Sequence, residues 1–211
     1  MSRQTRLKAI AVRRKFVSRS DAAYNRPMPT LTIALPPRED QTAFNLRRWT
    51  ELCSDTELAR ALAKIEGRVE SDRHGRVILS PVSSFTHGSL QSRIAGLLGD
   101  GLPNRRIVIA CPISTADGVR AADVAWISRA RLAKIGENVC LTKAPEICVE
   151  VLSPDNTRLE MRDKKALYFA AGAREVWFCD GKGKMTFFRG ATSAGERAST
   201  FCPQFPGLVQ V

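Results

Sequence analysis

APEICVEVLSPDNTRLEMRDKKALYFAAGAREVWFCD, residues 144–180, is the stretch of sequence that decides the fold. Apolar residues alternate with other residues in ICVEVL, and this period of two predicts a strand. A helix signal follows, because Thr157 and Glu160 have the spacing of a capping box and Gly172 is well placed to end the helix. The apolar run at 176–179 predicts a second strand. Strand, helix and strand in this order indicate an α/β fold.

Two carboxylates lie on predicted strands that are otherwise apolar. Glu150 shares a strand face with Cys148 and Leu152, and Asp123, in the stretch AADVAWIS, shares one with Ala125. An acid among apolar neighbours is unfavourable unless it is paired, protonated or bound to a metal. Each acid is therefore a candidate site residue, although either one alone could equally be a satisfied structural group.

A lysine on the predicted helix completes this candidate site. Glu160, Lys164 and Tyr168 follow one another at intervals of four, so they share one helical face, and Lys164 would reach both acids if their strands are neighbours. Paired carboxylates bind Mg²⁺ or a similar hard cation, and an ammonium group stabilises negative charge or orients water. The alternative is a surface ion pair between Glu160 and Lys164, worth about 0.3–0.5 kcal/mol.

Four motifs in a fixed order resemble the Uma-type family of restriction-endonuclease-like proteins, which have the PD-(D/E)XK nuclease core. They are R-x-x-D-V-A-W at 120–126, P-E-I-C-V-E-V-L-S-P at 145–154, E-x-x-x-K-x-x-x-Y at 160–168 and A-G-A-R-E-V-W-F-C-D at 171–180. The resemblance covers roughly Arg47 to Val211. It implies a mixed central β-sheet flanked by helices (α/β, or α+β) and a metal-dependent nuclease that hydrolyses phosphodiester bonds in DNA.

The resemblance also implies roles for individual residues. Asp123, Glu150 and Lys164 match the catalytic residues, with the lysine on the helix and Leu152 at the strand position that carries it in other nucleases of this core. Ala122 departs from the family, which usually has proline there. That change should loosen the entry to the strand without removing a metal ligand.

Four further residues are predicted to support the site. Glu70, on the first strand of a hairpin that turns at residues 72–75, matches an acid of the family pattern. The resemblance implies that it is a third ligand for Mg²⁺ or Mn²⁺ beside Asp123 and Glu150, or that it orients a ligand, and the alternative is that it faces solvent. His87 would contact a phosphate or cap a helix. Glu160 and Tyr168 would orient Lys164, and a contact from Glu160 would keep the lysine charged.

The positive charge of the chain is concentrated at its N-terminus. The formal net charge is +12, and residues 1–27 carry +7 of it, which leaves a moderately basic +5 for the remainder. We predict a basic arm and extended lead-in over residues 1–45 and a nuclease domain over residues 46–211. Arg13, Arg14 and Lys15 would contact DNA, or this arm is a translated leader upstream of a start at Met28.

The remaining sequence predicts ordinary elements and excludes several functions. A helix is expected from a capping box at Ser54 to Gly67, a second helix over Leu90–Leu98 and a strand over Arg105–Pro112. There is no phosphate-binding P-loop, no dinucleotide-binding G-x-G-x-x-G, no nucleophile elbow and no apolar run that could span a membrane.

The composition also suggests where the protein acts and with what. The six cysteines form no C-x-x-C pair, which favours free thiols in a reducing cytoplasm. DNA is the expected partner, and a homodimer is compatible with a nuclease that cuts both strands, although nothing in the sequence marks an interface. The alternative function is an inactive nuclease-fold module that binds nucleic acid or a protein partner.

Overall fold

The computed structural model describes residues 39–64, 67–80, 84–103, 105–136 and 138–211. The predicted DNA-contacting residues Arg13, Arg14 and Lys15 lie outside the described residues, as does Ile65 of the predicted first helix.

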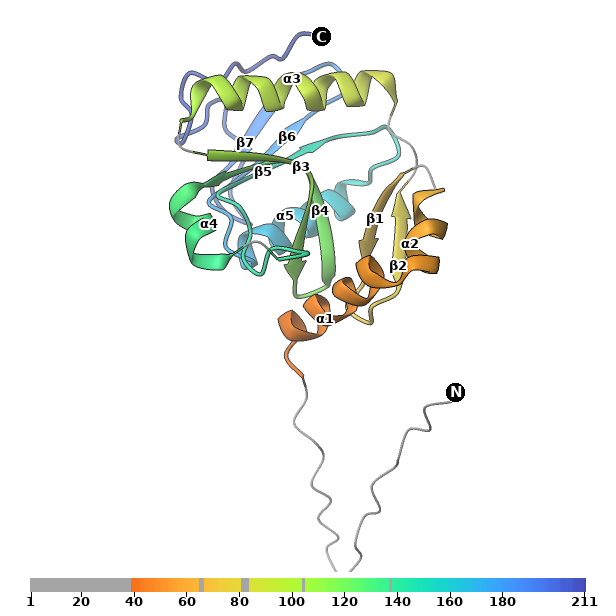
Figure 1. Cartoon of the computed structure of the whole chain (residues 1–211). Helices are drawn as coiled ribbons and strands as arrows, with labels where there is room; N and C mark the ends of the chain where they lie inside the picture. The colour runs from red at the N-terminus through yellow and green to blue at the C-terminus, as the bar shows by residue number, and fades with distance from the viewer. Residues whose placement is uncertain (1–38, 65–66, 81–83, 104, 137) are drawn as a thin grey trace, which may run out of the picture. The chain divides into compact units, whose positions relative to one another are not determined.

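Five strands form a mixed central sheet in the order β3-β4-β5-β6-β7 (Figure 1). Strands β5 and β6 are parallel and joined through a helix, whereas the other neighbours are antiparallel. The sheet confirms the predicted fold class. The strands are β3 (Arg105–Thr115), β4 (Gly118–Ser128), β5 (Ile147–Val151), β6 (Glu175–Cys179) and β7 (Met185–Phe188).

Helices cover both faces of this sheet. Helix α3 (Phe85–Gly101) buries Leu90, Ile94 and Leu98 against a core cluster that includes Val124, Val149 and Trp177. Helix α5 (Arg158–Ala170) lies on the opposite face, where Tyr168 packs with Ala125, Cys148 and Val176 (Figure 1). The two clusters take alternate residues of the same strands, as the period of two requires. A short helix, α4 (Arg129–Ile135), follows β4.

Helix α5 begins and ends where the sequence predicts. The backbone N–H of Glu160 donates to the side-chain oxygen of Thr157 at 3.1 Å, so Thr157 is the N-cap. Gly172 follows the helix with a φ of 102°, a conformation that favours glycine at a helix C-terminus. These two ends fix the helix between β5 and β6 and thereby set which residues it turns toward the sheet.

The N-terminal part of the described chain differs from the prediction. Helix α1 (Gln41–Ser54) begins after Asp40, so residues 41–45 are helical and not an extended lead-in. Ser54 ends this helix instead of capping the next one, because its hydroxyl donates to the carbonyl of Thr50 at 2.7 Å. The second helix, α2 (Thr56–Ala63), starts beyond Asp55, whose carboxylate accepts from the Glu57 N–H. Few residues of α1 are buried, which leaves its helical period weak in the sequence.

The predicted hairpin, strands β1 (Arg68–Ser71) and β2 (Val77–Ser80), packs on β4. The Ser71 hydroxyl oxygen accepts from the Val119 N–H at 3.1 Å. Gly118 makes this approach possible, since a Cβ there would lie 2.2 Å from the Ser71 carbonyl oxygen, and its φ of 93° also favours glycine. The hairpin thus carries its own side chains to the sheet. Among the described residues, no helix is long and apolar enough to cross a membrane.

Candidate active site

The pairing of β4 with β5 brings two acids together. Val124 and Val149 are partners in the antiparallel register, so Asp123 and Glu150 are the next residues along the two strands. Both are buried, at 4% and 2% exposure. The structure therefore joins the two acids that the sequence singled out, on neighbouring strands as expected.

Helix α5 turns Lys164 and Tyr168 toward Glu150. The ammonium nitrogen of Lys164 lies 3.0 Å from Oε2 of Glu150 and 3.1 Å from Oε1 of Glu70. The hydroxyl of Tyr168 donates to Oε1 of Glu150 at 2.6 Å. Lys164 thus reaches two acids, whereas Tyr168 orients Glu150 and not the lysine, which differs from the predicted role of the tyrosine.

Glu160 does not take the predicted place beside Lys164. Its side chain is exposed, and its carboxylate accepts from the Asn156 amide at 3.4 Å. The buried face of α5 runs through Met161, Lys164 and Tyr168, and Glu160 falls outside it. Residues at intervals of four drift around a helix with 3.6 residues per turn, and at Glu160 this drift is enough to turn the side chain to solvent.

Glu70 is buried at the sheet and does not face solvent. Its exposure is 5%, and its Oε1 accepts from the Ala121 N–H at 2.8 Å. Arg120 lies 3.7 Å from Oε2. With Lys164 on the same carboxylate, Glu70 connects the hairpin to the acids of the sheet.

His87 contacts Asp123 from the first turn of α3. Its Nε2 lies 3.4 Å from Oδ2 of Asp123, and the hydrogen bond between them raises the pKa of His87. Ser84 is the N-cap of this helix and accepts from the His87 N–H at 3.2 Å, so the imidazole does not cap it. Within the described residues, Nδ1 of His87 is buried with no hydrogen-bond partner.

Arg68 is a site residue that the sequence analysis missed. Its Nη1 lies 2.5 Å from Oδ1 of Asp123 and 3.5 Å from Oε2 of Glu150, and its Nε lies 3.8 Å from Oε1 of Glu70. One guanidinium group therefore contacts three acids. Its position in the sequence could have identified it, because Arg68 stands two residues before Glu70 and therefore lies on the same strand face.

The two central acids have opposite pKa shifts. Burial raises the pKa of Glu150, and the neighbouring charge of Asp123 adds to this effect. Burial also acts to raise the pKa of Asp123, but His87, Arg68 and the Val151 N–H together hold it below its ordinary value. Neighbouring carboxyl groups whose pKa values are pushed apart are typical of catalytic sites.

The backbone is unusual opposite Asp123. Ala110 has a φ of 48°, the one positive value among the described residues other than glycine. It stands between the pairs Ile109–Val124 and Cys111–Ala122, so it faces Asp123 across the two strands. Such conformations are costly for alanine and gather at functional sites.

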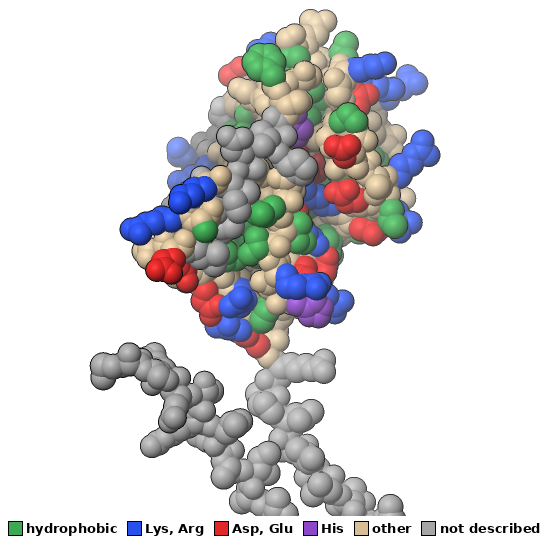
Figure 2. Space-filling view, turned by 90° about the vertical axis from the view of Figure 1, so that its right-hand side faces the viewer, with side chains coloured by type: hydrophobic (Ala, Val, Ile, Leu, Met, Phe, Trp, Pro, Cys, Tyr) green, Lys and Arg blue, Asp and Glu red, His purple; other side chains and the backbone are tan. Residues whose placement is uncertain are grey.

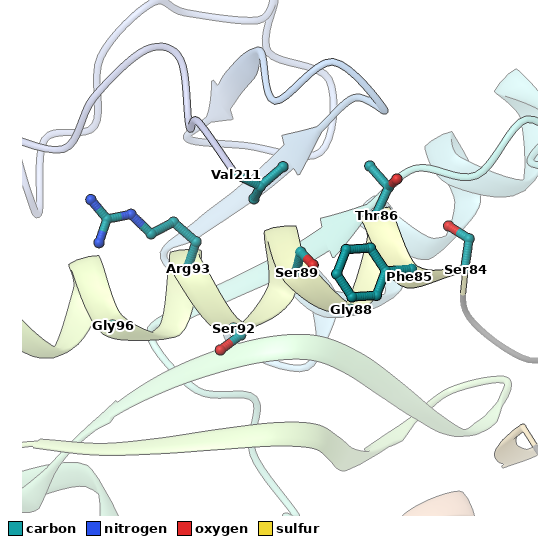
Figure 3. Close-up of a pocket in the computed structure, with 9 residues that line it drawn as sticks. All are labelled: Ser84, Phe85, Thr86, Gly88, Ser89, Ser92, Arg93, Gly96 and Val211. Atoms are coloured by element: carbon teal, nitrogen blue, oxygen red, sulfur yellow. The ribbon is translucent and has the colours of Figure 1, made fainter.

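Of the three site acids, Asp123 lines a hollow of about 710 Å³, together with Arg68, His87 and Val151. A second hollow, of about 910 Å³, runs along α3 and is lined by Ser84, Phe85, Thr86, Gly88, Ser89, Ser92, Arg93, Gly96 and Val211 (Figure 3). No carboxylate side chain lines this larger hollow, so the smaller one is the candidate active site. In Figure 2 the basic side chains of the face shown are interspersed with acidic ones and form no single basic patch.

The site has the donor chemistry of a divalent metal but holds an arginine among the donors. Oδ1 of Asp123 and Oε2 of Glu150 converge on Nη1 of Arg68, so the two carboxylates already share one cation. Carboxylate oxygens are the ligands that Mg²⁺ and Mn²⁺ prefer, and in this respect the residues fit such an ion. As they stand, the described side chains include no group of three or more His, Cys, Asp or Glu residues arranged to hold a metal.

Comparisons with known proteins identify a family and a fold. The family model Uma2, described as "Putative restriction endonuclease", matches residues 56–205. A crystal structure of a putative nuclease belonging to DUF820 from Anabaena variabilis ATCC 29413 is similar with a TM-score of 0.52. The two chains are 19% identical, and the similarity covers 64% of this chain and 80% of that one. No curated protein matches the sequence.

Proposed function

The chain belongs to the Uma2 family of putative restriction endonucleases, and from that membership we propose that it is a metal-dependent endonuclease that hydrolyses phosphodiester bonds in DNA. One observation carries the proposal: Asp123 and Glu150 are buried side by side on β4 and β5, with Lys164 3.0 Å from Glu150. A basic chain of net charge +12 suits a polyanionic substrate.

Asp123 and Glu150 would hold Mg²⁺ or Mn²⁺, and Glu70 would assist them. A bound ion of this kind offsets negative charge on the phosphodiester and lowers the pKa of a water molecule. The ammonium group of Lys164, held between Glu70 and Glu150, would stabilise the negative charge that develops on the phosphate.

Other residues of the chain would hold the two ligands in place. The Tyr168 hydroxyl fixes one oxygen of Glu150, and the Val151 N–H donates to Oδ2 of Asp123 at 2.8 Å. His87 approaches the same oxygen of Asp123. We assign these residues a positioning role, since they contact the ligands. Glu160 contacts Asn156 instead and does not orient Lys164.

One observation favours the alternative, a nuclease-fold module that binds DNA or a protein without cutting. Arg68 and Lys164 already neutralise much of the negative charge of the acids. A module that kept the fold for binding alone could use these ion pairs purely as structural links. The two functions differ in one respect that can be measured, which is cleavage in the presence of a divalent metal.

We further propose a homodimer, which would bring one site to each strand of DNA, and a cytoplasmic location. The location is supported by the cysteines, all six of which are free, five of them buried. Light scattering tests the first of these proposals, with twice the mass of the chain as the expected result.

The function is tested by incubating plasmid and single-stranded DNA with the protein and Mg²⁺ or Mn²⁺. The wild type should cleave, and EDTA should stop it. Asp123→Ala, Glu150→Ala and Lys164→Ala should each lower the rate by at least about a hundredfold while the protein remains folded. A folded wild type that cleaves no DNA or RNA and is not stabilised by metal would move the assignment to the binding module.

A further inference from the structure

Arg68 lies where the acidic side chains of the site meet. Its Nη1 contacts Asp123 and Glu150, and its Nε is nearest to Glu70, at 3.8 Å. That Nε is nonetheless buried with no hydrogen-bond acceptor within the part of the chain that the structure describes. Arg68 is therefore held by shared charge and by one short contact, without the full set of directed hydrogen bonds expected of a structural arginine.

A metal ion and Arg68 compete for the same space. Mg²⁺ binds oxygen at about 2.0–2.1 Å, so an ion shared by Asp123 and Glu150 would sit between Oδ1 and Oε2. Nη1 of Arg68 lies 2.5 Å and 3.5 Å from these two atoms. Both cations cannot occupy this position, so binding of the ion requires the guanidinium group to leave.

The charge of the site also favours departure of Arg68 when a divalent cation binds. Four carboxylates, those of Glu70, Asp117, Asp123 and Glu150, face three basic side chains, those of Arg68, Arg120 and Lys164. A divalent cation added to this set would change its net charge from −1 to +1. Departure of Arg68 would return the net charge to zero, and like charges at short range in a buried site repel strongly.

Arg68 also has room to leave. Its side chain is 23% exposed, whereas the side chains of the three acids are at most 7% exposed. It lines the hollow of about 710 Å³ beside Ser84 and Thr86. A change of side-chain rotamer can therefore carry the guanidinium into the hollow while β1 stays paired with β2.

We propose that Arg68 is the resident counter-ion of the metal site: it neutralises Asp123 and Glu150 in the metal-free protein and exchanges with the divalent cation. The inference rests on the proposed metal-dependent function and deepens it. After the exchange the guanidinium lies in the hollow that would admit DNA, where a phosphate group is the anion that it binds best.

Mn²⁺ binding tests the exchange without DNA and without turnover. The electron paramagnetic resonance signal of free Mn²⁺ gives the affinity of the wild type, Arg68→Met and the control Arg76→Met. Arg76 pairs with Asp72 at the exposed turn of the same hairpin, and its side chain is 77% exposed. We expect Arg68→Met to bind Mn²⁺ at least about tenfold more tightly, because no cation has to be displaced, and Arg76→Met to match the wild type.

A second variant and a resonance of Arg68 itself distinguish the exchange from a loss of folding. Arg68→Gln also removes the charge but keeps an amide that can donate to Asp123, and it should tighten Mn²⁺ binding in the same direction. In the folded wild type, the side-chain Nε–Hε resonance of Arg68 should shift when Mg²⁺ saturates the protein. A resonance that stays in place at saturation would overturn the exchange.

The outcomes separate this inference from the proposed function. Asp123→Asn should abolish the Mn²⁺ binding of the wild type. If binding is lost in Asp123→Asn but neither Arg68 variant binds more tightly than the wild type, the exchange is wrong and the metal site stands. If Asp123→Asn binds Mn²⁺ as the wild type does, the ion is not held at this site, and both proposals fail.

Discussion

Glu175 is a buried carboxylate whose chemistry contrasts with that of Glu150. It lies on β6 opposite Ile147, whereas Glu150 is opposite Phe178 further along the same pair of strands. Its oxygens accept from Ser199, Thr200, Phe201 and Trp177, so the protein itself supplies every partner. An acid with such a set is held as a structural carboxylate.

Replacing this carboxylate by an amide should make stability less dependent on pH. Burial raises the pKa of Glu175, but the hydrogen bonds from Ser199, Thr200 and Trp177 outweigh it and lower the folded pKa below the ordinary 4.5. The stabilisation is complete above 4.5 and is lost as the pH falls through the lower folded value. Glu175→Gln should therefore cost about 2 kcal/mol of unfolding free energy at pH 7.

Urea unfolding at pH 7 and below pH 4 measures this difference. The cost of Glu175→Gln should shrink at the lower pH, because the stabilisation by the charged carboxylate is lost as the pH falls from 4.5 through the lowered folded pKa. The same loss of unfolding free energy at both pH values would show that the charge of Glu175 does not contribute to stability.

Tyr168 should act on cleavage through Glu150. Tyr168→Phe removes the hydroxyl that donates to Oε1 at 2.6 Å, which should cost about 1–3 kcal/mol of stability and lower kcat about tenfold or more. Thr200→Val is the matched control, because it removes a hydroxyl donor from Glu175 instead. Steady-state cleavage of a defined DNA should show the loss of kcat in Tyr168→Phe alone. Equal rates in the two variants would contradict the positioning role.

At the scale of single residues, sequence patterns identify buried acids but not their roles. Asp123 and Glu150 stand within predicted apolar strands, whereas Glu175 is the first residue of β6 and lies just before the predicted strand at 176–179. Their roles depend on which donors approach from elsewhere: Thr200 for Glu175, Lys164 for Glu150 and Arg68 for Asp123. These contacts join residues that are far apart in the sequence. They depend on how the elements pack, which a single sequence does not reveal.

Among the elements, the hairpin β1–β2 depends on Gly118. Gly118→Ala adds a Cβ that would lie 2.2 Å from the Ser71 carbonyl oxygen, in a conformation with a φ of 93°. Gly136→Ala is the matched control, because its φ is 68° but nothing lies within 4 Å of the added atom. The control should cost about 1–3 kcal/mol, because its φ of 68° and ψ of 177° form a conformation that is essentially restricted to glycine.

Thermal unfolding should show a clearly larger loss for Gly118→Ala than for Gly136→Ala. Equal melting temperatures for the two variants would mean that the hairpin does not need this close approach.

The elements around residues 144–180 are predictable because local signals agree with the global fold. Thr157 and Gly172 end α5 as expected, and the alternation in β5 matches its two core clusters. Helix α1 was missed because only Asn45, Trp49 and Leu52 are buried on it, so its face toward the core is narrow. The position of α1 is set by contacts such as the hydrogen bond from the Asn45 amide to the Ser114 hydroxyl oxygen, at 3.0 Å.

At the scale of the whole molecule, the basic N-terminal arm should contribute to DNA affinity and not to chemistry. Residues 1–27 hold +7 of the net charge of +12. Deleting them should weaken DNA binding and flatten its dependence on salt, because fewer counterions are released. Binding isotherms at several salt concentrations measure the slope. Cleavage at saturating protein should survive the deletion, and its loss would assign the arm a catalytic role.

The family resemblance predicted from four motifs is confirmed by the Uma2 match, and the mixed sheet flanked by helices confirms the fold. The four motifs lie at β4, β5, α5 and β6, and the first three of these elements carry Asp123, Glu150 and Lys164. The contribution of the hairpin was only partly predictable, because Arg68 reaches Asp123 across 55 residues of sequence.

The most direct test of the central claim compares two buried strand carboxylates in one assay. Nicking of supercoiled plasmid with Mg²⁺ is measured for the wild type, Glu150→Gln and Glu175→Gln at a temperature where all three are folded. We expect Glu150→Gln to lose at least about a hundredfold in cleavage rate and Glu175→Gln to cut like the wild type. Equal rates for Glu150→Gln and the wild type would contradict the assignment of the acid pair as the active site.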